Sequence, residues 1–144
     1  DHPDGEPHYG FGIVGDLPSP LTYGEFTDKL ASTLGKPAWR ACGPRSDTIS
    51  RMAYCPGSGE SMLAEAVRLG ADIYLTGDMK YHAALETPIR ALDVGHFILE
   101  EVMTRTFADM LRDRCAPVTV TFVEAADPFI FEGSPQGDRP NPSI

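Results

Sequence analysis

Positively charged residues are scarce in this 144-residue sequence. The chain holds 12 Lys and Arg against 21 Asp and Glu, which gives a net charge of -9 and a pI of about 4.7. Proteins that bind nucleic acid neutralise phosphates with clustered Lys and Arg, so this composition predicts no nucleic-acid partner. The acidic surface could attract cations, although solubility alone would also explain it.

Long apolar runs and paired cysteines are absent as well. No stretch approaches the roughly 20 apolar residues of a membrane helix, and no basic start followed by an apolar run marks a secretory signal. Cys42, Cys55 and Cys115 are widely spaced and include no C-x-x-C. Together these absences predict a cytoplasmic protein with reduced thiols and no membrane partner.

What the sequence does contain is a regular alternation of predicted strands and helices. Hydrophobic residues make up 42% of the chain, which is enough for one core at this length. Apolar runs predict strands at 39–42, 48–55, 72–76, 90–94 and 117–124, and a short extended piece at 12–14. Helical periodicity predicts helices at 22–34, 60–69, 79–85 and 96–115. This order predicts an α/β fold, with a mixed or mostly parallel sheet and flanking helices.

Two of these helices have clear signatures in the sequence. Thr22, with Glu25 three residues later, forms a capping box. The same helix places three apolar residues on one face, Phe26, Leu30 and Leu34. The longest predicted helix carries an apolar stripe made of Leu99, Val102, Met103, Thr106, Phe107, Met110 and Leu111.

The two ends of the chain differ from this middle part. Residues 1–8 are polar and contain two prolines, which predicts the stump of a linker between domains. Residues 132–144 are rich in Pro and Gly and predict a disordered tail. The α/β domain is therefore expected to occupy residues 9–131.

The residues that carry chemistry gather in the stretch 72–101. A predicted strand ends in Thr76-Gly77-Asp78, His82 follows it, and the next strand leads into Gly95-His96. Glu100 lies four residues after His96, so both side chains would share one face of a helix. An imidazole and a carboxylate at this spacing can reach one divalent ion, although a lone H-x-x-x-E also arises by chance.

A glycine-rich turn, Gly57-Ser58-Gly59, lies between a predicted strand and a predicted helix. Its backbone N–H groups could hold an anion at the edge of the sheet, or the turn could serve packing alone. The turn matches neither the P-loop nor the G-x-G-x-x-G dinucleotide fingerprint, and it is not the G-x-S-x-G nucleophile elbow. A serine hydrolase is therefore not expected.

The order of these motifs is more specific than any one of them. T-G-D at 76–78, His82, and G-H-x-x-x-E at 95–100 resemble the second half of the Nif-three-like family, also called GTP cyclohydrolase I type two homologues. G-I-V-G-D-L-P at 12–18 and G-S-G at 57–59 resemble further blocks of that family. The resemblance implies one half of a two-domain fold, completed by an N-terminal half.

By this resemblance, His96 and Glu100 would be ligands of a centre that holds two divalent ions, and a mixed N/O set suits Zn, Mn, Fe or Co. His82 would stand beside the metals as an acid/base group or a substrate contact, unless it is a hydrogen-bonded core histidine. Asp78 would orient His82 or cap the following helix, and Asp93 would orient the turn before His96 or serve the local structure alone. Family members form hexameric rings, so a homo-oligomer is expected.

Two functions stay open at this point. The first is a metal-dependent hydrolase, GTP cyclohydrolase-like or otherwise, that acts on a nucleotide-like or phosphorylated small molecule. The second is a non-catalytic metal-binding or protein-interaction module, or a half-domain that is inactive without its companion. Two protein ligands rarely hold a metal tightly, because catalytic zinc takes about three and structural zinc about four. The sequence determines neither the substrate nor the metal.

Overall fold

The structure, a computed structural model, describes residues 10–35 and 38–129. The linker stump expected at 1–8 and the disordered tail expected at 132–144 lie outside the described residues. Within the described part of the chain, no helix is long and apolar enough to cross a membrane.

The core of the fold is a five-stranded sheet with the order β1-β3-β4-β5-β2. Its three central strands are parallel, and the strands at both edges run antiparallel to their neighbours. The strands are β1 (Ile13–Thr22), β2 (Arg40–Cys42), β3 (Thr48–Tyr54), β4 (Ile73–Thr76) and β5 (Arg90–Asp93). This mixed sheet with flanking helices confirms the predicted fold class.

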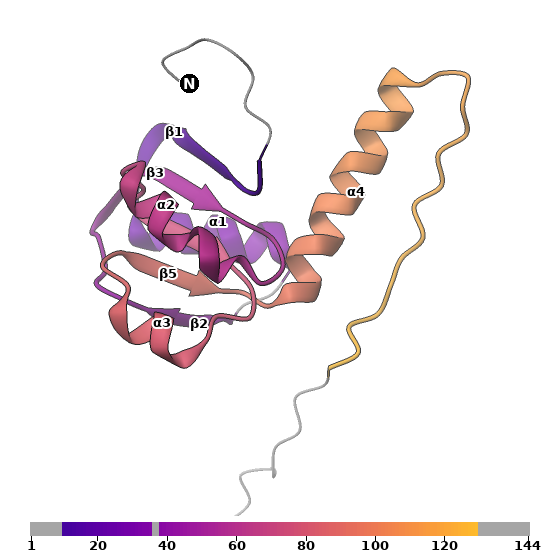
Figure 1. Cartoon of the computed structure of the whole chain (residues 1–144). Coiled ribbons are helices and arrows are strands. Elements are labelled where there is room, and N and C mark those ends of the chain that lie inside the picture. The colour runs from indigo at the N-terminus through magenta and orange to yellow at the C-terminus, as the bar shows by residue number, and fades with distance from the viewer. Residues whose placement is uncertain (1–9, 36–37, 130–144) are drawn as a thin grey trace, which may run out of the picture.

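Helices cover both faces of the sheet, which gives three layers (Figure 1). The helical segments are α1 (Tyr23–Leu34), a 3-10 turn (Gly59–Met62), α2 (Leu63–Arg68), α3 (Tyr81–Glu86) and α4 (His96–Arg114). One apolar cluster joins α1 and the start of α4 to one face, and a second cluster joins α2 and α3 to the other. The two faces alternate along β4, where Ile73 and Leu75 enter the first cluster and Tyr74 enters the second.

The start of α1 follows the sequence prediction closely. The Thr22 hydroxyl accepts a hydrogen bond from the backbone N–H of Glu25 at 3.2 Å, and the Glu25 carboxylate accepts one from the N–H of Thr22 at 2.8 Å. This reciprocal pair satisfies two N–H groups that a helix start otherwise leaves open. The predicted apolar face is buried, with Phe26, Leu30 and Leu34 each at most 9% exposed.

The first strand is longer than the sequence prediction, which was wrong to end it after Val14. β1 covers ten residues, and its pairing with β3 is interrupted between Asp16 and Leu21. Pro18 and Pro20 lie in this interruption, because proline has no N–H to donate to a neighbouring strand. An edge strand tolerates both prolines, so the strand resumes after them.

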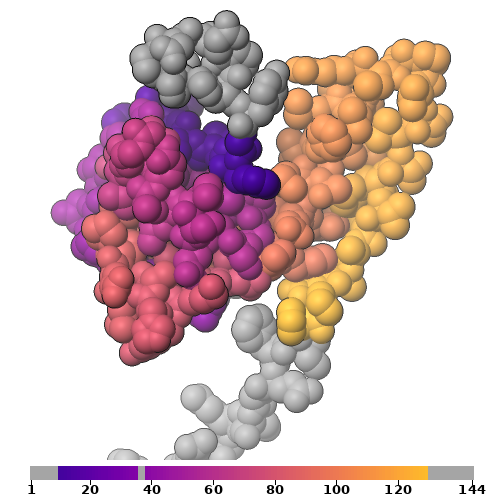
Figure 2. Space-filling view, in the orientation of Figure 1, coloured from indigo at the N-terminus to yellow at the C-terminus, as the bar shows by residue number. Residues whose placement is uncertain are grey.

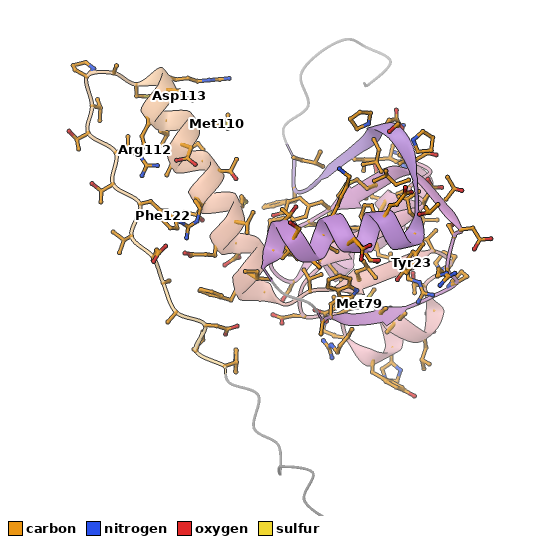
Figure 3. All side chains as sticks on the ribbon, turned by 180° about the vertical axis from the view of Figure 1, so that it is seen from behind. Tyr23, Met79, Met110, Arg112, Asp113 and Phe122 are labelled. Atoms are coloured by element: carbon orange, nitrogen blue, oxygen red, sulfur yellow. The ribbon has the colours of Figure 1, made fainter. Side chains whose placement is uncertain are left out.

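The predicted strand at 117–124 is also wrong. α4 leaves the sheet, and the following residues run back beside it as an extended segment without strand pairing (Figure 1). Arg112 donates to the carbonyl of Val120 at 3.1 Å, and Arg105 forms an ion pair with Glu124 at 2.9 Å. Figure 3 shows Phe122 between the segment and α4, and the Arg105 guanidinium lies 4.5 Å from its ring centre. The alternating pattern of the segment is real, but the segment pairs with no strand of the described sheet.

We call residues 103–129, the second half of α4 with this returning segment, the C-terminal arm. Figure 2 shows it standing beside the layered domain as a separate ridge. Much of its apolar stripe is exposed, with Met103 and Met110 at 44% and Phe107 at 57%. The first turns of α4, around the buried Leu99, belong to the larger core cluster, whereas Ala108, at 7% exposed, is the one buried residue among 103–129.

Candidate functional site

The candidate site lies where the central strands β4 and β5 end. β4 leads into Gly77 and Asp78, and β5 leads through Val94 and Gly95 into His96, the first residue of α4. Gly95 has a φ of +98°, a left-handed conformation that favours glycine. Ligands of open α/β sheets bind outside this carboxyl edge of the strands. The T-G-D and G-H-x-x-x-E motifs therefore meet at this edge of the sheet.

His96 contacts a carboxylate through each of its ring nitrogens. Nδ1 lies 2.6 Å from Asp78 Oδ2, and Nε2 lies 3.0 Å from Glu100 Oε1. A neutral imidazole can donate from only one nitrogen, whereas the protonated ring donates from both. The hydrogen bond to Asp78 is the main cause that raises the pKa of His96, with the Glu100 carboxylate adding to it. Without a metal, this arrangement favours the imidazolium form.

Asp78 reaches His96 rather than either of the groups predicted for it. The N-terminal cap of α3 is Lys80, which makes no side-chain capping bond, and the Asp78 carboxylate turns to the imidazole of His96. Its backbone φ is +51°, a left-handed conformation that is uncommon outside glycine. The Ser58 hydroxyl donates to the same carboxylate at 3.4 Å. The turn after β4 thus aims one carboxylate at the imidazole.

The glycine turn packs directly against this pair. A Cβ on Gly57 would lie 3.2 Å from Glu100 Oε1 and 3.4 Å from His96 Nε2, so a larger residue would crowd both side chains. The Gly57 carbonyl accepts from the N–H of Gly77 at 3.0 Å, which ties the turn to the end of β4. The N–H of Gly59 donates inside the protein, to the Thr76 hydroxyl at 3.0 Å. Close packing explains the glycines, and an anion role for 57–59 stays a prediction.

Asp93, at the end of β5, is buried and accepts three hydrogen bonds. Its partners are the N–H of Gly95 at 3.1 Å, the N–H of Met79 at 3.0 Å, and the Arg40 guanidinium. The first of these bonds fixes the turn that leads into His96, and a role of Asp93 in orienting a metal ligand stays a prediction. The charge of Asp93 is balanced by Arg40, since a buried carboxylate without a cation would be costly.

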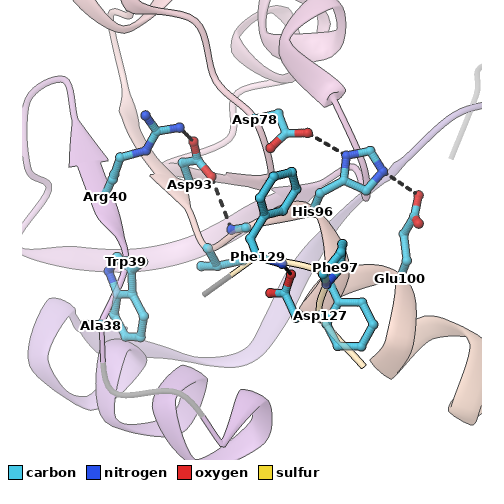
Figure 4. A pocket seen from close by; sticks show the side chains of 13 residues that line it. Ala38, Trp39, Arg40, Asp78, Asp93, His96, Phe97, Glu100, Asp127 and Phe129 are labelled. Carbon is cyan, nitrogen blue, oxygen red and sulfur yellow. Dashed lines mark hydrogen bonds and ion pairs between the residues drawn. The ribbon is translucent and has the colours of Figure 1, made fainter. Parts of the chain in front are cut away.

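A cavity of about 820 Å³ opens beside these groups. Figure 4 shows the Asp78–His96–Glu100 series at one side of it and the Arg40–Asp93 pair at the other. Three aromatic side chains also line it, Trp39, Phe97 and Phe129. The sequence reasoning missed Arg40 and these aromatics as site residues. The one available signal was the single tryptophan of the chain, placed next to an arginine in a short strand.

His82 lies apart from the cavity. It is exposed on α3 and packs edge-on against the Tyr81 ring, with 5.6 Å between ring centres. It is not among the residues that line the cavity. The acid/base role expected for His82 therefore receives no support from this arrangement and stays a prediction.

The geometry of His96 and Glu100 suits a metal ion. In the described part of the chain, no group of three or more His, Cys, Asp or Glu is placed to hold one. The Nε2 and Oε1 atoms are 3.0 Å apart. Two ligand atoms bound to one ion at about 2.1 Å lie roughly 3.0–3.4 Å from each other. Asp78 on Nδ1 matches the carboxylate–histidine arrangement that orients metal ligands. The pair fits as part of a site that takes further ligands from elsewhere.

Known proteins share both the sequence and the fold of this chain. A GTP cyclohydrolase 1 type 2 homolog from Staphylococcus epidermidis is 36% identical over 109 residues, which cover 74% of this chain and 30% of that protein. A homolog of the same name from Clostridium perfringens is 33% identical over 128 residues, covering 85% and 48%. A Bacillus cereus protein related to NIF3 has a similar structure, with a TM-score of 0.69 and 30% identity over 85% of this chain and 36% of that one.

The chain thus spans roughly a third to a half of the length of these relatives. Residues 3–128 match the family described as Duf34/NIF3 (NGG1p interacting factor 3). This match covers most of the chain and agrees with the motif order and the structural likeness. The chain belongs to the Duf34/NIF3 family.

Proposed function

We propose that His96 and Glu100 are two ligands of a divalent-metal centre, and that the intact protein is a hydrolase acting on a nucleotide-like or phosphorylated small molecule. The observation that carries this proposal is the Asp78–His96–Glu100 series at the carboxyl edge of the sheet. It combines a metal-ligand pair at helical spacing with a carboxylate behind the imidazole. It also opens onto a cavity large enough for a small molecule.

Each residue of the series has a separate task in this proposal. Asp78 accepts a hydrogen bond from the N–H of Nδ1. This holds the neutral ring in the tautomer whose Nε2 lone pair is available to the ion. Glu100 supplies a carboxylate oxygen from the next turn of α4. Without a metal, the imidazolium carries a second proton on Nε2, the nitrogen that faces Glu100. This proton must leave when an ion binds Nε2. Metal binding should therefore release protons and strengthen as the pH rises.

Two ligands are too few for tight binding, so we expect the remaining ligands from polypeptide outside the described residues. The relatives are two to three times as long as the matched region, which leaves room for such a companion domain. The donors suit Zn, Mn, Fe or Co, and a site between two domains could hold two ions. A homo-oligomer would be a further source of ligands.

When bound, such ions would act as Lewis acids and bring the pKa of a coordinated water towards neutrality. The protein around them would bind the substrate in the cavity and exclude bulk water. The names of the relatives, GTP cyclohydrolase 1 type 2 homologs, agree with a nucleotide-like substrate.

The experiment that tests the proposal is metal analysis by elemental mass spectrometry on protein purified without chelator. We would compare this chain with the chain joined to the additional domain that its longer relatives contain. We expect little metal in this chain alone and up to two ions in the longer protein. In the longer protein, His96→Ala and Glu100→Ala should each reduce or abolish the content of both ions. Full metal occupancy in both variants would show that these residues are not ligands.

A second candidate function, a protein-interaction module, is favoured by the C-terminal arm. Its exposed apolar residues include Met103, Phe107, Met110, Val118 and Val123. Contiguous exposed apolar surface is typical of contact sites with other polypeptides. Light scattering after size exclusion would compare the chain with Phe107→Glu. A mass that falls in the variant supports an association surface, and an identical mass in both proteins speaks against one.

A further inference from the structure

The cavity has two chemically different ends. One end holds the Asp78–His96–Glu100 series, and the other holds the Arg40–Asp93 pair (Figure 4). Aromatic rings line the space, with Phe129 seen between Arg40 and His96. A wall of this kind suits the flat face of a ring, because offset stacking on an aromatic side chain combines area burial with favourable electrostatics.

Arg40 is held in place, and its contacts with the other described residues leave some of its donors unused. Its contacts with Asp93 and with the Met79 carbonyl both use Nη2, the latter at 3.5 Å. The guanidinium has five N–H donors in a fixed plane, so Nη1 can donate to a molecule in the cavity. The side chain is 73% exposed while its partner Asp93 is 6% exposed. A buried carboxylate thus fixes an accessible guanidinium at the cavity wall.

The charges of the cavity decide what kind of group Arg40 would recognise. Four carboxylates line it, on Asp78, Asp93, Glu100 and Asp127, against the two cationic groups of Arg40 and His96. Asp93 already balances the charge of Arg40. An anionic group at this end would find the charge of Arg40 already balanced and would face the excess of carboxylates in the cavity, so a neutral hydrogen-bond acceptor suits it better.

We propose that the cavity binds a planar heteroaromatic ring that stacks on Trp39 or Phe97 and turns a neutral acceptor, such as a ring carbonyl, towards Arg40. This inference deepens the proposed function and rests on it only for the reacting group, which would face His96 and Glu100. Arg40 is then the residue that determines specificity. It favours a ring with an acceptor on that edge over the same ring with an amino donor there, because two donors facing each other leave both unpaired.

Trp39 provides a direct readout, because it is the single tryptophan in the chain. The probes are inosine and adenosine, which share the ribose and the purine frame but differ in having a carbonyl or an amino group on the ring. We would titrate each into the full chain, once with chelator and once with zinc, and follow Trp39 fluorescence. We expect saturable quenching, with inosine binding about tenfold more tightly than adenosine in both conditions, the effect of one hydrogen bond to a charged donor.

Variants separate recognition from folding. Arg40→Met should bring the affinity for inosine down to that for adenosine. Arg40→Lys keeps a cation beside Asp93, so the fold should be retained. This variant should also lose the preference for inosine over adenosine, because lysine lacks the planar guanidinium group. Phe97→Leu should weaken both nucleosides. Arg45→Met is the matched control, since Arg45 lies over the Tyr23 ring at 5.0 Å and does not line the cavity.

The outcomes also distinguish this inference from the proposed function. A preference for inosine that both Arg40 variants lose supports the inference, whatever the metal content. No saturable quenching by either nucleoside, equal affinities, or a preference that survives in Arg40→Met and Arg40→Lys overturns it. Metal content, measured separately on the same samples with His96→Ala as reference, decides the metal centre independently.

Discussion

The layered domain and the C-terminal arm use apolar residues in opposite ways. In the layers, Ile73, Leu92 and Val94 are completely buried. In the arm, Phe107 is 57% exposed and Val123 is 80% exposed. α4 belongs to both regions, because its first turns carry His96 and Leu99 into the domain while its second half leaves it (Figure 1). The layered domain therefore positions His96 and its carboxylate partners, whereas the arm adds Asp127, Pro128 and Phe129 to the wall of the cavity.

The largest expected effect breaks the layered domain. Leu92→Ala removes a fully buried side chain from the central sheet and should lower the free energy of unfolding by about 2–5 kcal/mol. Met110→Ala on the arm, where the side chain is 44% exposed, should change it by about 0.5 kcal/mol or less. Urea denaturation of both variants measures the difference. Equal losses would show that the arm is packed as tightly as the layers.

The next effect concerns the junction between the two regions. Asp78→Asn removes the carboxylate behind Nδ1 of His96 and should lower zinc affinity by roughly 10- to 100-fold, as measured by calorimetry. It should also bring the pKa of His96 down. Asp113→Asn, at the exposed far end of α4, is the matched control and should leave both quantities unchanged (Figure 3). Wild-type affinity in Asp78→Asn would mean that the pairing has no role in metal binding.

The pH dependence of stability in the metal-free protein also tests the contact between His96 and Asp78. The pKa of His96 is raised above its ordinary value of 6.5, chiefly by the hydrogen bond to Asp78. The contribution of the imidazolium to stability is therefore fully present below a pH of about 6.5, and it is lost as the pH rises through the folded-state pKa. Unfolding free energies measured across this range should fall for the wild type. They should fall less in His96→Gln.

The smallest expected effect is that of His82→Ala. His82 is exposed on α3 and does not line the cavity. We expect the variant to keep the stability and the zinc affinity of the wild type to within about 0.5 kcal/mol. A large loss of zinc affinity would place His82 at the metal after all, through a rearrangement of α3.

The sequence predicted the parts of the fold that depend on local chemistry. The capping box at Thr22, the buried face of α1, and the parallel strands leading to Asp78 and His96 follow from spacing and turn residues. The strand expected at 117–124 is wrong because alternation reports the character of a segment, whereas a strand also needs a neighbouring strand to pair with. The apolar stripe of α4 likewise predicted a helix but not which half would be covered.

The candidate site likewise combines local contacts that follow from the sequence with long-range contacts that do not. His96 and Glu100 meet because both lie on one helix, and the turn at Asp93 follows from the adjacent strand. The Asp78–His96 contact is made from a left-handed backbone conformation at Asp78, and no sequence pattern predicted that conformation. Arg40 and Trp39 reach the cavity because β2 pairs antiparallel with β5, a long-range contact that periodicity cannot reveal.

The most direct test of the proposed metal centre is a zinc titration followed by NMR of the histidine ring nitrogens, because it detects weak as well as tight binding. We expect Nε2 of His96 to lose its proton and shift with added zinc, while His82 stays unchanged and Glu100→Gln weakens the response. An imidazole of His96 that keeps its protonated signals at millimolar zinc would contradict a metal centre at this pair.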